Sequence, residues 1–333
     1  KPVKVEKLGG GRYRVDFGET VSGWVRLHGV RGEAGRRIEI KYLSESPNGS
    51  NTYTMKGEGP EDYATRFTWY VFREVELSGW PGELHPGQLT AEAVYSDVET
   101  TGGFACSNPL LNRIDRIWWR TQLDNMHGAV ASDCPHRERC GWLGDGHVIA
   151  EALLTRYDAA SFLHKYARDI ETGGRRVTDE PRVGPNYGTI VREPKPAGIP
   201  HMITPGKRRC NATSPDWGSA QVFIPWEICT QTGDVRILQE FLEPMRTWID
   251  YLGSIADPRT GLLVTGLGDW CSPAMRRAAE SGTPWIGNAE IPILSSGMYI
   301  RCCRILAQTE ELVGDRTRSR HYRQLADTLS RRL

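Results

Sequence analysis

Hydrophobic and polar positions alternate along the first hundred residues. Alternating, aromatic or β-branched segments occur in five short stretches: 13–17, 24–27, 38–42, 67–77 and 90–95. Because successive side chains of a strand point to opposite faces, this pattern predicts strands with one buried face. Clusters of Gly, Pro and Asn separate the stretches. We therefore expect residues 1–101 to form an antiparallel β-sandwich domain.

The hydrophobic period changes to that of a helix after Gly102-Gly103. Ser107-Asn108-Pro109 combines a capping residue with a proline at the first helical position, which marks the start of a helix. The helical period is clearest in three later stretches: 234–252, 294–306 and 322–329. The apolar spacing predicts about seven helices, and we expect residues 102–333 to form a second, helical domain.

Composition and charge narrow the classes of function. Lys and Arg number 42 and Asp and Glu 41, for a net charge of +1. A nucleic-acid partner is not expected, because such binders carry a basic excess. No apolar run reaches the length of about 18 residues that a membrane span needs. The start of the chain also lacks an apolar signal region.

Eight cysteines are scattered along the chain without a Cys-x-x-Cys pair. This pattern favours reduced thiols and a cytoplasmic location over a disulfide framework. Cys134, His136 and Cys140 lie close together but lack a fourth ligand and the usual zinc spacing. We therefore expect no metal and no cofactor.

The densest polar stretch is Asp133-Cys134-Pro135-His136-Arg137-Glu138-Arg139-Cys140-Gly141-Trp142-Leu143-Gly144-Asp145. Pro135 disfavours helix at the preceding residue, so Asp133 and Glu138 are expected on a loop. Asp145 then falls in the first turn of the next helix. A loop that leads into a helix N-terminus can direct all three carboxylates toward one pocket.

Three carboxylates in one pocket suit the cleavage of a glycosidic bond. That reaction needs a proton on the leaving oxygen, and a carboxylic acid supplies it near neutral pH only if its pKa is raised. Neighbouring carboxylates and burial both raise it. Tryptophans offer flat apolar faces to sugar rings, and Trp142, Trp217 and Trp270 each lie beside glycines or acids. The combination indicates a carbohydrate pocket.

The same residues also have a purely structural interpretation. Arg137, Glu138 and Arg139 can form a solvated ion-pair network, and spacing alone does not exclude this. Trp217 and Trp270, taken singly, are more typical of a core than of a binding site.

The stretch from Asp133 to Asp145 resembles a motif of bacterial α-L-rhamnosidases of glycoside hydrolase family 78. That motif reads Asp-Cys-Pro, a polar residue, Arg, Glu-Arg and Gly-Trp-x-Gly-Asp. The resemblance extends over nearly the whole chain. Further matching segments are Asp16-Phe17-Gly18, Ser22-Gly23-Trp24, Gly102-Gly103-Phe104, Trp217-Gly218-Ser219-Ala220 and Gly266-Leu267-Gly268-Asp269-Trp270.

The resemblance implies a β-sandwich followed by an (α/α)6 toroid, and an enzyme that removes terminal α-L-rhamnose with inversion and without a metal. Glu138 corresponds to the general acid, and Asp133 and Asp145 to rhamnose-binding carboxylates. The other residues expected to bind substrate are Arg137, Trp142, Trp217, Asp269 and Trp270.

The chain departs from the family pattern in its length. An (α/α)6 toroid has twelve helices, whereas about seven are predicted here. The family's general base is a late glutamate with no match here, so it is expected beyond Leu333. The expected partners are a rhamnosylated glycoside or oligosaccharide, together with a missing C-terminal segment or a second copy of the chain.

Two other functions fit the same residues. One is a toroid glycosidase that acts on another sugar, which a panel of aryl glycosides would reveal. The other is a non-catalytic carbohydrate-binding or structural remnant, which would bind sugar without hydrolysing it.

Overall fold

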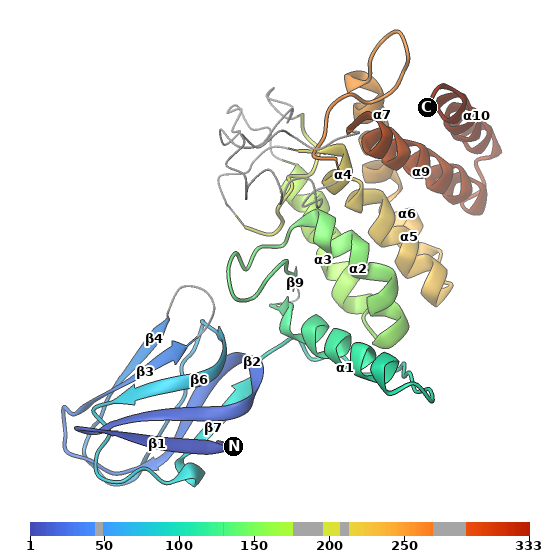
Figure 1. The fold of residues 1–333 in the computed structure, drawn as a ribbon. Helices are drawn as coiled ribbons and strands as arrows, with labels where there is room; N and C mark the ends of the chain where they lie inside the picture. The colour runs from blue at the N-terminus through green and yellow to red at the C-terminus, as the bar shows by residue number, and fades with distance from the viewer. Residues whose placement is uncertain (44–48, 129, 176–195, 207–212, 269–290) are drawn as a thin grey trace, which may run out of the picture. The chain divides into compact units, whose positions relative to one another are not determined.

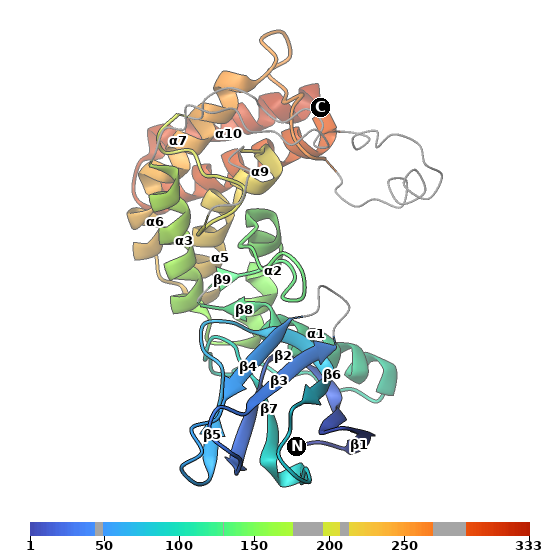
Figure 2. The ribbon, with the colours of Figure 1, turned by 90° about the vertical axis from the view of Figure 1, so that its left-hand side faces the viewer.

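The computed structural model describes residues 1–43, 49–128, 130–175, 196–206, 213–268 and 291–333. These residues form two compact units, whose elements are labelled in Figures 1 and 2. The first unit contains residues 1–97, 106–128 and 133–139, and the second contains 98–105, 129–132 and 140–333. None of the described helices is long and apolar enough to cross a membrane.

The first unit is built on an antiparallel sheet of seven strands. The strand order is β1-β2-β6-β3-β4, and β5 and β7 also pair with β2. The strands are β1 (Lys4–Gly9), β2 (Arg12–Val30), β3 (Arg37–Leu43), β4 (Ser50–Thr54), β5 (Glu61–Tyr63), β6 (Tyr70–Ser78) and β7 (Leu89–Ala93). One 3-10 turn, η1 (Pro86–Gln88), precedes β7.

The alternation seen in the sequence sets the core of this unit. On β3, Ile38, Ile40 and Tyr42 are fully buried while the residues between them are exposed. One detail of the prediction is wrong: stretches 13–17 and 24–27 are not two strands but parts of the single strand β2. The register of β2 against β6 shifts between Asp16 and Val21. This irregular segment lets β2 continue as one long strand.

The first unit also contains the helix α1 (Pro109–Asp124) and the short strand β8 (Met126–His127). The predicted helix start is confirmed, because the Asn108 side chain accepts a hydrogen bond from the Leu110 amide at 2.9 Å. The far end of α1 is tied to β2, where the Ser22 amide donates to Asp124 Oδ1 at 3.2 Å.

The second unit is helical. Its elements are β9 (Val130–Ala131), α2 (Leu143–Arg156), α3 (Ala160–Gly174), α4 (Pro215–Gly218), α5 (Ala220–Thr232), α6 (Arg236–Glu240), α7 (Leu242–Ile255), α9 (Ile291–Leu312) and α10 (Arg316–Arg332). Helix α5 packs against α2 and α3, and α9 runs beside α10 (Figures 1 and 2). The helices predicted at 294–306 and 322–329 are confirmed as α9 and α10.

The helix predicted over residues 234–252 is interrupted. It is divided at Phe241 into α6 and α7, and Phe241 itself lies outside helical geometry with φ −99° and ψ 9°. Pro244 explains the break, because it has no amide to donate to the carbonyl of Glu240 and its ring crowds that carbonyl. The apolar face continues across the break, with Leu238, Met245 and Trp248 buried.

A buried ion pair joins α7 to α9. Arg246 Nε and Nη2 each lie 2.7 Å from a carboxylate oxygen of Glu310, whose side chain is fully buried. The same guanidinium also contacts the exposed Glu243 on its own helix. These bonds compensate for taking the Glu310 charge out of water.

Candidate active site

The sequence-predicted site residues fall into two groups. Asp133, Arg137 and Glu138 belong to the first unit, on the segment 133–139, and Trp142, Asp145 and Trp217 belong to the second unit. The remaining two, Asp269 and Trp270, lie outside the described residues.

The segment 133–139, where a loop was predicted from Pro135, contains a tight turn at residues 135–138. The amides of Arg137 and Arg139 both donate to the Cys134 carbonyl, at 3.3 and 3.2 Å. The Cys134 thiol donates to Asp133 Oδ2 at 2.8 Å. Burial, followed by this hydrogen bond to a carboxylate, raises the pKa of the Cys134 thiol. The thiol therefore stays protonated and helps to orient Asp133.

Glu138 lies in the same turn and is largely covered. Its side chain is 18% exposed, and Oε1 lies 3.5 Å from Arg137 Nη2. The Arg137 side chain is 65% exposed, so its charge is well solvated and the pair is weak. The Glu138 side chain is thus largely covered by protein.

Arg139 has an unusual conformation for a residue with a side chain. Its φ is 56°, in the left-handed region, which costs a non-glycine residue roughly 1–2 kcal/mol. Its guanidinium carbon lies 5.5 Å from the ring centroids of both Trp69 and Tyr70. Each cation–π contact contributes about 0.5–1 kcal/mol or more, so the two together can offset the backbone cost.

Of the ion-pair network considered for Arg137, Glu138 and Arg139, the structure shows the Arg137–Glu138 pair. The Arg139 guanidinium lies over the rings of Trp69 and of Tyr70 in β6. Trp69 in turn stacks on His127, with ring centroids 4.3 Å apart and planes inclined by 9°. His127 Nε2 is 2.8 Å from Ser22 Oγ. Burial lowers the pKa of His127 to about 4, so its ring is neutral at pH 7.

In the second unit, the entry to α2 is held by backbone hydrogen bonds. The Leu143 amide donates to the Met202 carbonyl and the Thr204 amide to the Gly141 carbonyl, both at 2.9 Å. These bonds fix the half-buried Trp142 between them. Asp145 follows in the first turn of α2, as predicted. A carboxylate there is favoured by the helix dipole.

Trp217 packs directly against the start of α2. A Cβ atom added to Gly144 would lie 2.6 Å from Trp217 Cε2, so the indole occupies the space that a larger residue would need. Gly144 immediately precedes Asp145. The structure thus places one predicted aromatic beside the helical turn that carries one predicted carboxylate.

Asp216 is a polar residue that sequence reasoning did not single out. It is 5% exposed, and its Oδ2 accepts from the amides of Leu267 and Gly268 at 2.6 and 3.0 Å. Ser295 Oγ donates to Oδ1 at 2.9 Å. Burial raises the pKa of Asp216, and these donors counteract that shift. The carboxyl group joins α4 and α9 to the backbone that precedes Asp269.

His147 supports the same region from α2. Its Nε2 donates to the Asp216 carbonyl at 2.9 Å. Burial lowers the pKa of His147 to about 4, so the ring is neutral and serves as a structural donor at pH 7. The only sequence signal for Asp216 was its position as an acid beside Trp217.

A metal interpretation of the cysteines gains no support from the described residues. Among them, no group of three or more His, Cys, Asp or Glu side chains is arranged to hold a metal ion. Six cysteines are free thiols in this part of the chain: Cys106, Cys134, Cys140, Cys229, Cys302 and Cys303.

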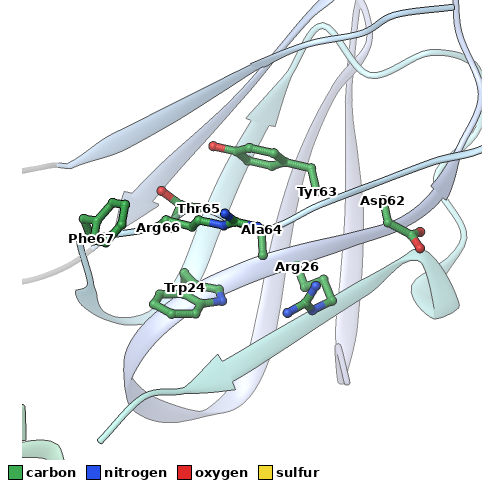
Figure 3. A pocket seen from close by; sticks show the side chains of 8 residues that line it. All are labelled: Trp24, Arg26, Asp62, Tyr63, Ala64, Thr65, Arg66 and Phe67. Atoms are coloured by element: carbon green, nitrogen blue, oxygen red, sulfur yellow. The ribbon is translucent and has the colours of Figure 1, made fainter.

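The sheet of the first unit has a cavity of about 580 Å³ that is not lined by residues of the Asp133–Asp145 motif. Figure 3 shows Trp24 and Arg26 of β2 facing a segment that follows β5. The cavity is lined by Trp24, Arg26, Asp62, Tyr63, Ala64, Thr65, Arg66 and Phe67. It contains none of the predicted carboxylates of the Asp133–Asp145 motif, so it is not a candidate for bond cleavage.

Comparison with known proteins decides the family. Residues 99–333 match the model of the bacterial α-L-rhamnosidase six-hairpin glycosidase domain, and residues 6–95 match that of the bacterial α-L-rhamnosidase concanavalin-like domain. The chain belongs to the bacterial α-L-rhamnosidase family. Its fold is therefore a concanavalin-like β domain followed by a six-hairpin glycosidase domain, as the sequence predicted.

Two curated relatives named α-L-rhamnosidase illustrate the similarity. One, from Formosa agariphila, is 32% identical over 317 residues, which cover 90% of this chain and 32% of the relative. The other, from Streptomyces avermitilis, is 32% identical over 288 residues, covering 80% and 25%. The present chain thus spans about a third or less of the length of these relatives.

Solved structures agree on the fold. The α-L-rhamnosidase of Dictyoglumus thermophilum superposes on all of this chain and 36% of its own, with a TM-score of 0.83 and 27% identity. The Streptomyces avermitilis α-L-rhamnosidase complexed with L-rhamnose superposes on 98% of this chain and 30% of its own, with a TM-score of 0.81 and 24% identity.

Proposed function

We propose that the protein containing this chain hydrolyses terminal α-L-rhamnosides, with Glu138 as the general acid. The observation that carries the proposal is the Asp133–Asp145 motif, which lies within a matched rhamnosidase domain and keeps Glu138 in a protein-lined turn. The two relatives described above carry the same enzyme name.

The residues of the motif suit distinct parts of the reaction. Glu138 protonates the departing glycosidic oxygen, so that the leaving group departs as a neutral alcohol. Asp133 and Asp145 accept hydrogen bonds from sugar hydroxyls, and Arg137 donates to them. Trp142 and Trp217 offer apolar faces to the pyranose ring. Asp269 and Trp270 complete the proposed set.

The stereochemical outcome at the anomeric carbon is part of the proposal. In an inverting reaction a second carboxylate activates water on the face opposite the leaving group. An α-rhamnoside then releases β-L-rhamnose first, which proton NMR detects before the anomers equilibrate. Initial release of the α anomer would contradict inversion but leave the assignment of Glu138 intact.

The experiment that tests the acid role is Glu138→Gln in the intact protein. We expect kcat on phenyl α-L-rhamnoside to fall by roughly 10²–10⁴, because the amide cannot donate a proton to the leaving oxygen. Rhamnose affinity, measured by calorimetry, should change little. Turnover close to that of the wild type would remove Glu138 from its role.

The leaving group provides an internal control. A 2,4-dinitrophenolate leaves without protonation, so Glu138→Gln should slow the 2,4-dinitrophenyl rhamnoside far less than the phenyl rhamnoside. Glu83→Gln changes an exposed glutamate of the same unit and should leave both rates unaltered. Equal losses on both substrates would show that the variant damages the fold rather than proton transfer.

A further inference from the structure

Two aromatic residues of the β domain contact the segment that carries Glu138. Arg139 follows Glu138 directly, and its guanidinium lies 5.5 Å from the ring centroids of Trp69 and Tyr70. These residues all belong to the first compact unit, although the two family models assign Arg139 and the two rings to different domains.

The ring platform is itself fixed on both sides. Trp69 stacks on His127 at 4.3 Å, and His127 is bonded to Ser22 of β2. Tyr70 stacks on the fully buried Tyr42, with centroids 4.2 Å apart. The guanidinium therefore rests on rings that are anchored in the sheet and on β8.

The contacts of Arg139 with the two rings matter because the backbone of Arg139 is strained. Its φ of 56° is unfavourable for a residue with a Cβ, so something must hold it there. The Arg139 amide returns to the Cys134 carbonyl at 3.2 Å and closes the turn around Glu138. Loss of the ring contacts would let this residue relax and would move the adjoining Glu138 carboxyl group.

We infer that Trp69 and Tyr70 are positioning residues that hold the proposed general acid in place through Arg139. The inference rests on the proposed role of Glu138. It assigns to the β domain an indirect part in proton delivery, because its rings position the acid through Arg139. Neither ring is expected to touch the sugar.

The test is the dependence of rate on the leaving group in the intact enzyme. Misplacement of the acid should lower kcat on phenyl α-L-rhamnoside by about tenfold and on the 2,4-dinitrophenyl rhamnoside by less than about twofold. We expect this selective loss for both Trp69→Leu and Arg139→Gln. Trp69→Phe keeps a ring face and should retain most of the rate on phenyl rhamnoside.

Phe67→Leu is the matched control. Phe67 lies two residues before Trp69 in the chain, its side chain is fully exposed, and it should leave both rates unchanged. Arg139→Gln alters no core residue, so it decides the question if Trp69→Leu does not fold. Uniform losses on both substrates, or none, for Arg139→Gln would overturn the inference.

The rates of Glu138→Gln on the two substrates separate the proposed acid role from the proposed positioning role. If Glu138→Gln lacks the leaving-group-selective loss, the proposed acid is wrong. If Glu138→Gln shows it and the Arg139 and Trp69 variants do not, Glu138 stands and only the positioning role falls.

Discussion

At the scale of single residues, one glycine determines how closely Trp217 approaches α2. Gly144 has no side chain, and a Cβ atom at this position would lie only 2.6 Å from Cε2 of the Trp217 indole. The indole is a rigid ring within a packed environment, so it cannot move aside without displacing its neighbours. Gly144 thus lets an aromatic face and the Asp145 turn lie side by side.

We predict that Gly144→Ala displaces Trp217 and weakens substrate binding. Overpacking of this kind typically costs about 1–3 kcal/mol of folding stability, so the thermal midpoint should fall. KM should rise because the displaced indole no longer faces the sugar. The measurement is steady-state kinetics together with the thermal midpoint. Gly297→Ala on α9 meets no atom within 4 Å and should leave KM unchanged. An unaltered KM for Gly144→Ala would argue against Trp217 as a pocket residue.

At the scale of elements, local periodicity located part of the fold, because burial alternation depends only on neighbouring residues. The elements it located are β2, β3, β6 and β7 and the helices α1, α6, α7, α9 and α10. The continuity of β2 depends on its pairing with β6 across an irregular segment, which the local pattern does not contain. Pro244 signalled the break between α6 and α7 in the sequence. The prediction followed the continuous apolar face and therefore gave one helix.

The same distinction applies to the candidate site. Asp133, Glu138 and Asp145 could be predicted because they share one contiguous motif. Asp216 and Trp69 could not, because their partners are distant in sequence and only the fold brings them together.

The ion pair between α7 and α9 gives a prediction at this scale. Glu310→Ala leaves Arg246, among the residues that the structure describes, with the exposed Glu243 as its ion-pair partner, and breaking a buried pair costs about 3–5 kcal/mol. Denaturant unfolding should report a loss near the lower end of that range. Glu311→Ala removes a neighbouring pair with Arg323, in which both side chains are 58% exposed, and should cost less than about 1 kcal/mol. Equal losses would contradict the burial argument.

At the scale of the whole molecule, each compact unit contains one buried neutral histidine. The pKa of His127 in the first unit and of His147 in the second is lowered from 6.5 to about 4. The unfolded chain therefore binds more protons between these values, and stability falls as pH drops from about 6.5 to 4. Asp216, whose pKa is raised, has the opposite effect.

We predict that His147→Gln makes the second unit less sensitive to acid. The wild-type histidine should account for about 2 kcal/mol of the stability lost between pH 7 and pH 5. The amide of glutamine can still donate to the Asp216 carbonyl but does not titrate. Thermal midpoints at the two pH values should therefore differ less in the variant. An unchanged difference would show that His147 is solvated in the folded protein.

The segments that make up the first unit bear on how members of this family can be recombined. The two family models meet between residues 95 and 99, yet the compact unit also takes in residues 106–128 and 133–139. A chimera joined at the model boundary would graft a foreign sheet beneath Arg139 and Asp124. Its activity should depend on whether the donor supplies equivalents of Trp69, Tyr70 and Ser22, so exchange of the β module alone is not a neutral swap.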